Sequence, residues 1–93
     1  MNYEEARDVL RDHLQEYRRR SYTDLVQLLG LPQTGERVGP SGTTYQIEVE
    51  VFWDSDPGGN IRVQGAIDDK GWHALVPHCE DFILTPKGIF IGE

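Results

Sequence analysis

The stretch YQIEVEVFWDSDPGGNIRVQGAIDD, residues 45–69, carries the most regular pattern in this chain of 93 residues. Apolar and polar residues alternate up to Trp53, a segment rich in Asp, Pro and Gly intervenes, and the alternation resumes at Ile61. A period of two is typical of a strand that buries one face, and Asp, Pro and Gly are ordinary turn residues. The stretch therefore predicts an antiparallel hairpin in which Trp53 lies opposite Ile61.

The same register gathers polar and aromatic side chains on the outer face of the predicted sheet. With a further strand over 72–76, the predicted neighbours are Phe52 with Arg62, Glu50 with Gln64, Glu48 with Ala66, Gln46 with Asp68, His73 with Ala66, and Leu75 with Gln64. The wet face of an antiparallel sheet carries such residues by default. Aromatic residues and arginine also dominate the energetics of interfaces, so this face predicts a recognition surface centred on Phe52 and Arg62. Its predicted binding residues are Glu48, Glu50, Phe52, Arg62, Gln64 and His73.

Residues 1–32 predict a helical layer. Asn2 suits the N-cap of a first helix, and Ser21 suits the N-cap of a second, short helix that ends at Gly30. Apolar residues recur along the first helix at spacings of three and four, which predicts one buried stripe. The members of this stripe are Tyr3, Ala6, Leu10, Leu14 and Tyr17.

The rest of the chain predicts strands and turns. The segment QTGERVGPSG, which follows the helices, predicts a loop with at most a short edge strand around Arg37 and Val38. The final segment DFILTPKGIFIGE predicts a hairpin with Gly88 in its turn. Gly65 stands where an inward side chain is expected, which fits either the close approach of a helix or a β-bulge.

This order of elements predicts an α+β fold. Two N-terminal helices would pack on one face of a four- to five-stranded antiparallel meander sheet, because short turns favour pairing between successive strands. The chain of 93 residues suffices for one domain over 1–93, with a helical layer at 1–32 and the sheet at 43–93.

The charge of the chain narrows the class of partner. The formal net charge is −7, and residues 44–93 contain nine acidic and three basic residues, a net of −6. This excess repels phosphate backbones, so no nucleic-acid partner is expected, and a basic protein or a cation is favoured. No apolar run is long enough to predict a membrane span. The lone Cys79 and the charged, h-region-free N-terminus predict a cytoplasmic protein.

Three motifs invite a chemical interpretation. DSDPGG at 54–59 matches part of a calcium loop, but Gly65 replaces the closing glutamate, and the segment predicts a turn. IDDKGW predicts a hairpin turn, with a metal site formed by Asp68, Asp69 and His73 as the alternative. His78 and Cys79 are adjacent in an extended segment, so they point to opposite faces and predict no catalytic dyad. No cofactor is predicted.

The second half of the chain resembles a group of small bacterial α+β proteins without an assigned function. The resemblance covers 41–93 and rests on the patterns YxxExxxFWD, GGxIRV, IDDxGW and DFxxxPxGxFxGE. It carries no catalytic assignment. The segment VQLLGLP at 26–32 is also similar to a motif of two-helix, sheet-covering domains of the inhibitor-protein type.

Together these patterns predict a non-enzymatic binding module. The acidic sheet suits the capture of a basic partner, as immunity or inhibitor proteins capture a cationic toxin, and charge would speed the association. One alternative is a small-ligand or metal-dependent enzyme that uses Asp68, Asp69 and His73. Another is a self-associating structural domain, a homodimer formed through the edge strand GIFIGE.

Overall fold

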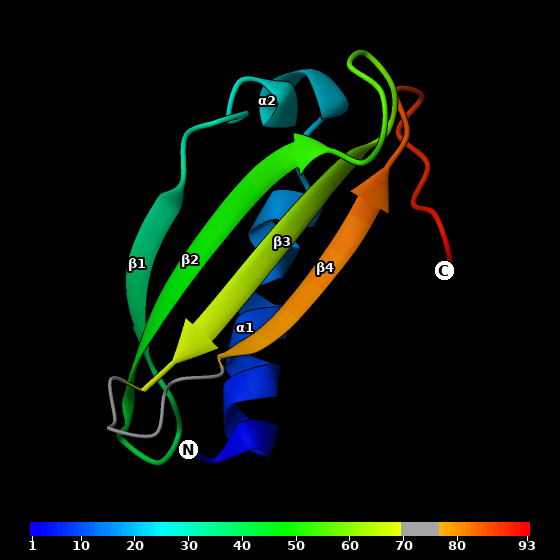
Figure 1. Cartoon of the computed structure of the whole chain (residues 1–93). Coiled ribbons are helices and arrows are strands. Elements are labelled where there is room, and N and C mark those ends of the chain that lie inside the picture. The colour runs from blue at the N-terminus through cyan, green and yellow to red at the C-terminus, as the bar shows by residue number, and fades with distance from the viewer. Residues whose placement is uncertain (70–76) are drawn as a thin grey trace.

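A computed structural model describes residues 1–69 and 77–93. Within these residues, two helices come first and four strands follow (Figure 1). The elements are α1 (Tyr3–Arg18), α2 (Tyr22–Val26), β1 (Gln33–Val38), β2 (Thr44–Trp53), β3 (Ile61–Asp68) and β4 (His78–Leu84). The predicted α+β class is confirmed. In the part of the chain described, no helix is both long and apolar enough to cross a membrane.

The sheet is an antiparallel meander whose spatial order, β1-β2-β3-β4, follows the sequence. The predicted register of its central hairpin is confirmed, because Trp53 pairs with Ile61 and Phe52 pairs with Arg62. Alternation along β2 and β3 sends every second side chain to the helical side, where it is buried. The hydrophobic pattern therefore fixes the register, as a slip by one residue would expose the whole apolar set.

The sheet begins earlier than the sequence predicts. β1 spans Gln33–Val38 and pairs with β2 along its whole length, from Gln33 opposite Val49 to Val38 opposite Thr44. The prediction allowed only a short strand around Arg37 and Val38. Gly35 and the charged residues of QTGERV conceal the alternation, and pairing with the long strand β2 overrides this weak local propensity.

The predicted pairing between β3 and the strand that follows it is wrong. Cys79 pairs with Ala66 and Asp81 pairs with Gln64, in place of the predicted His73 and Leu75. The strand predicted over 72–76 lies outside the described residues, as do His73 and Leu75. The prediction assumed the shortest turn after β3, and this assumption set the register too early in the sequence.

The C-terminal segment forms a turn but no complete fifth strand. Gly88 N donates to Thr85 O at 2.9 Å, and Gly88 has a φ of +82°, so the predicted turn and its left-handed glycine are confirmed. Beyond the turn, Leu84 and Phe90 form an isolated bridge, and Ile91 N donates to Ile83 O at 3.0 Å. This segment adds a few contacts to the end of β4.

The core lies between α1 and the sheet, and α1 contacts β3 and β4 (Figure 1). Gly65 in β3 explains how closely the layers approach, because an added Cβ would lie 2.8 Å from Leu10 Cδ1 and 3.1 Å from Leu14 Cδ2. The ladders on both sides of Gly65 are continuous, so close approach of the helix, and not a bulge, accounts for this glycine. Four of the five stripe residues are buried, whereas Tyr3 in the first turn is 52% exposed.

Side-chain caps begin both helices, as predicted. Asn2 Oδ1 accepts from Glu5 N at 3.0 Å, and Ser21 Oγ accepts from Asp24 N at 3.1 Å. The short helix α2 covers the end of the sheet with Leu25, which is fully buried. Its Tyr22 hydroxyl donates to Gly59 O at 2.7 Å and so ties α2 to the turn between β2 and β3.

Candidate functional site

The register of β2 and β3 brings five of the predicted binding residues together on the outer face of the sheet. These residues are Glu48, Glu50, Phe52, Arg62 and Gln64. The two glutamates are exposed, and the Phe52 ring is 37% exposed. The sixth predicted residue, His73, lies outside the described residues.

Acidic residues dominate this outer face. The carboxylates on the outer face of the four strands are those of Glu36, Glu48, Glu50, Asp68 and Asp81. Glu48 and Glu50 project from the same side of β2, and a hydrogen bond with the Glu50 carboxyl raises the pKa of Glu48, with burial and charge repulsion acting in the same direction. A cation beside this pair would relieve the repulsion and favour the ionised form of Glu48.

Two carboxylates of the outer face hold the Arg62 guanidinium. Nε and Nη2 of Arg62 donate to Asp54 Oδ1 at 3.1 and 2.8 Å, and Nη1 donates to Asp81 Oδ2. The hydrogen bonds to Asp54 and then to Asp81 raise the pKa of Arg62. Sequence reasoning missed both partners, although the diagonal relation of Asp54 to Arg62 across the hairpin is a usable signal. Since Arg62 is engaged within the chain, the glutamate pair and Phe52 are the more available groups.

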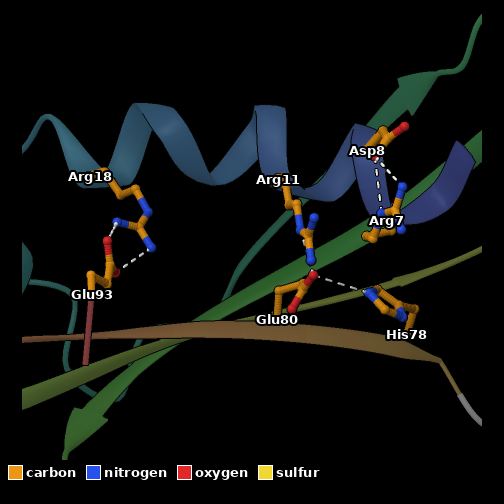
Figure 2. Close-up of polar contacts among 7 residues, drawn as sticks. All are labelled: Arg7, Asp8, Arg11, Arg18, His78, Glu80 and Glu93. Carbon is orange, nitrogen blue, oxygen red and sulfur yellow. Dashed lines mark hydrogen bonds and ion pairs between the residues drawn. The ribbon is translucent and has the colours of Figure 1, made fainter. Parts of the chain in front are cut away.

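The helical layer has two electrostatically different flanks, because residues of opposite charge segregate around α1. The basic flank faces β4, where Arg11 Nε donates to Glu80 Oε1 at 2.7 Å and Arg18 donates to both carboxylate oxygens of Glu93 (Figure 2). Arg18 also lies over the rings of Phe82 and Phe90, 4.7 and 4.9 Å from their centroids. This flank is closed by cross-element ion pairs and stacking.

The second flank of α1 faces β1 and is open. A groove of about 490 Å³ lies between the N-terminal half of α1 and the end of β1. Its lining consists of Asn2, Glu4, Glu5, Asp8, Val9 and Asp12 of the helical segment together with Arg37, Val38 and Pro40. Sequence reasoning missed this groove, because the residues of β1 carry no clear strand pattern of their own.

A hydrogen-bonded carboxylate closes one end of this groove. Glu5 accepts from Ser41 Oγ at 2.7 Å, from Ser41 N at 3.1 Å and from Tyr45 OH at 2.7 Å. The side-chain bond from Ser41 and then that from Tyr45 lower the pKa of Glu5. Burial and the bond to Glu5 raise the pKa of Tyr45 to about 12. Gly39 packs against this pair, since an added Cβ would lie 2.9 Å from Tyr45 Cε2.

Arg37 spans the other end of the groove. Its Nη2 donates to Asp12 Oδ2 at 2.7 Å, and its Nη1 lies 3.5 Å from His13 Nδ1. Burial, followed by the charge of Arg37, lowers the pKa of His13. This arrangement favours the neutral form of His13 beside a guanidinium that is already paired with a carboxylate.

The alternative metal site receives no support from the residues that the structure describes. Asp68 lies on the outer face opposite Gln46, whereas the Asp69 carboxylate lies 3.8 Å from the amino-terminal nitrogen of Met1. Within residues 1–69 and 77–93, no group of three or more His, Cys, Asp or Glu side chains is placed to hold a metal ion. The proposed third ligand, His73, lies outside the described residues.

His78 and Cys79 point to opposite faces of β4, as the sequence predicts. Cys79 is exposed on the outer face beside Ala66. His78 lies on the helical side, where its Nε2 is 3.5 Å from Glu80 Oε1 without the alignment of a hydrogen bond (Figure 2). Burial would raise the pKa of Glu80, but Arg11 and His78 outweigh it and lower that pKa. Because their side chains lie on opposite faces of β4, His78 and Cys79 form no nucleophile–base pair.

No family model, curated protein or solved structure matches this chain. The resemblance to a group of small bacterial proteins therefore stays a prediction.

Proposed function

We propose that the protein is a binding module that captures a basic partner protein through the outer face of its sheet. The observation that carries this proposal is the Glu48–Glu50 pair, two exposed carboxylates on the central strand β2, of which Glu50 raises the pKa of Glu48. A partner Lys or Arg side chain seated between them would replace repulsion by attraction. Complementary charge accelerates encounter between proteins and discriminates against acidic partners.

The neighbouring residues suit an interface. Phe52, Arg62 and Ile83 form one cross-strand row on the outer face, next to the row that contains Glu50. The Phe52 ring offers apolar area, and the ion-paired Arg62 offers a rigid surface, because Asp54 and Asp81 already fix its guanidinium. In this proposal the glutamate pair governs the association rate and the row around Phe52 governs the residence time. We place the interaction in the cytoplasm.

Charge reversal tests the proposal. Proteins from the native host are captured on the unchanged chain, on a Glu48→Lys/Glu50→Lys variant and on a Glu16→Lys/Asp56→Lys variant, and the association rate of each captured partner is then measured. Both variants change the net charge equally, but the second does so away from the outer face. We expect a basic partner whose association slows at least about tenfold with the first variant only. Equal association with all three proteins would contradict the proposal.

A further inference from the structure

We propose a second docking site, in which the groove between α1 and β1 binds an extended basic segment of a partner protein. The segment would pair with the edge of β1 and place a Lys or Arg side chain in the groove. The groove lies on the helical side of the sheet, so this inference does not depend on the outer face being a binding surface.

The backbone of β1 offers an edge for such pairing. Among the strands that the structure describes, β1 is an edge strand, because it pairs with β2 and with no other strand. Gly39 N donates to Thr43 O at 2.9 Å, and the bonded and non-bonded pairs of an antiparallel ladder alternate from there. Thr34 and Val38 therefore direct their N–H and C=O groups away from β2. Added strands use such edges and obtain affinity from main-chain hydrogen bonds.

Side chains of an added strand alternate between the two faces of the sheet, so every second one would point toward α1. There it would meet the groove, whose apolar lining is Val9, Val38 and Pro40. The Val38 side chain alternates onto the outer face, where Val38 is 68% exposed, so Val9 and Pro40 supply the apolar side chains of the groove. The aliphatic stem of Lys or Arg fits this lining, because long basic side chains cover apolar surface while their charged ends stay in water.

Charge complementarity selects the basic occupant. Four carboxylates line the groove, those of Glu4, Glu5, Asp8 and Asp12, against the single guanidinium of Arg37. Arg37 is already paired with Asp12 at 2.7 Å, and Glu5 is saturated by Ser41 and Tyr45. Glu4 and Asp8 are exposed and four residues apart on α1, and Asp8 shares its Oδ1 with Arg7, whose Nη2 lies 3.1 Å away. These two carboxylates can therefore receive the charged end of a side chain whose stem lies on Val9 and Pro40.

A peptide titration followed by backbone amide NMR tests the proposal on the full chain. The probe is a seven-residue peptide with Lys at alternate positions and Val or Thr between them, and the matched peptide has Glu in place of Lys. We expect the Lys peptide to shift the amide signals of β1 and of the N-terminal half of α1, and the Glu peptide to shift neither. Shifts confined to β2 and β3, or no shifts at millimolar peptide, would overturn the proposal.

Variants separate the edge from the groove. Val38→Pro removes an N–H that points away from β2, so the hydrogen bonds between β1 and β2 remain and pairing with the peptide is lost. Thermal melting verifies that the variant stays folded. Glu4→Gln/Asp8→Asn leaves the backbone unchanged and should weaken the Lys peptide about fivefold or more, whereas Glu48→Gln/Glu50→Gln should not. The opposite order of the two double variants would overturn the proposal. So would a concentration-dependent dimer that Val38→Pro dissolves, because the edge would then belong to a second copy of the chain.

Discussion

The two faces of β2 and β3 are built from neighbouring residues and follow different rules. On the helical side Val49 and Val63 are fully buried, and Gly65 has no room even for a Cβ. On the outer side Glu48 lies next in sequence to Val49 but is exposed to solvent. Packing constrains each atom of the first face, whereas the second tolerates mutually repelling carboxylates. Stability and recognition thus occupy alternate residues of the same strands.

The largest effect should come from removing core volume on the helical side. Leu10→Ala deletes a fully buried side chain that lies over Gly65. We expect it to lower the free energy of unfolding by about 2–5 kcal/mol, because the lost transfer energy adds to the cost of a cavity. Urea denaturation measures the change, with the exposed Gln15→Ala of the same helix as the control. A loss below about 1 kcal/mol would mean that α1 does not pack on β3 as described.

A pair of substitutions at adjacent positions of β3 should sharpen the contrast between the faces. Gly65→Val introduces a side chain where the first added carbon would already lie 2.8 Å from Leu10 Cδ1, and should cost about 1–3 kcal/mol. Ala66→Val adds similar volume on the outer face and should change stability by less than about 0.5 kcal/mol. Chemical denaturation of both variants provides the comparison. Equal effects would show that the outer face is as tightly packed as the inner one.

A smaller, pH-dependent effect is expected at the carboxylate that joins the helical layer to the β1–β2 turn. The pKa of Glu5 is lowered in the folded state, so its stabilising contribution is present above its unfolded pKa and is lost as the pH falls through the folded pKa. Glu5→Gln should therefore lower the melting temperature near neutral pH, and the difference from the unchanged chain should shrink on acidification. A pH-independent difference would contradict the role of the charge, and Glu4→Gln serves as the control.

The smallest effect should have the opposite sign and lie on the outer face. The pKa of Glu48 is raised in the folded state, so its contribution is favourable below its unfolded pKa and is lost as the pH rises through the folded pKa. Glu48→Gln should accordingly raise the melting temperature slightly near neutral pH, with no difference in acid. Gln64→Glu, which adds a carboxylate opposite Glu50, should lower the melting temperature near neutral pH when the same measurement is made.

Alternation was sufficient to predict the centre of the sheet. Along β2 the residues Tyr45, Ile47, Val49 and Val51 are buried and Trp53 is half-buried, whereas Phe52 faces outward with the polar residues, so the Trp53–Ile61 register followed from the sequence. β1 escaped prediction because its strand character comes from pairing with β2 and not from its own residues. The partner of Ala66 escaped because the length of a connection is not encoded in the periodicity of the strands that it joins.

The candidate sites were predictable to different extents. The outer face followed from register alone, but the two carboxylates that engage Arg62 required the positions of Asp54 and Asp81 in space. The groove required even more, because it arises where α1 meets a strand that was not expected to extend so far. Site residues that belong to one hairpin can be predicted from their spacing in the sequence. Site residues that meet between a helix and a strand depend on the packing of the whole fold.

The alternating bonds of β1 should be visible in the exchange of amide protons with deuterated water. Gly35 and Arg37 donate into the sheet and should exchange slowly, whereas Thr34 and Val38 face away from β2 and should exchange fast. A strand that binds at the edge would slow the amide exchange of Thr34 and Val38 and leave the exchange of Gly35 and Arg37 unchanged. One residue-resolved exchange profile of six consecutive amides thus reports both the register of β1 and the occupancy of its edge.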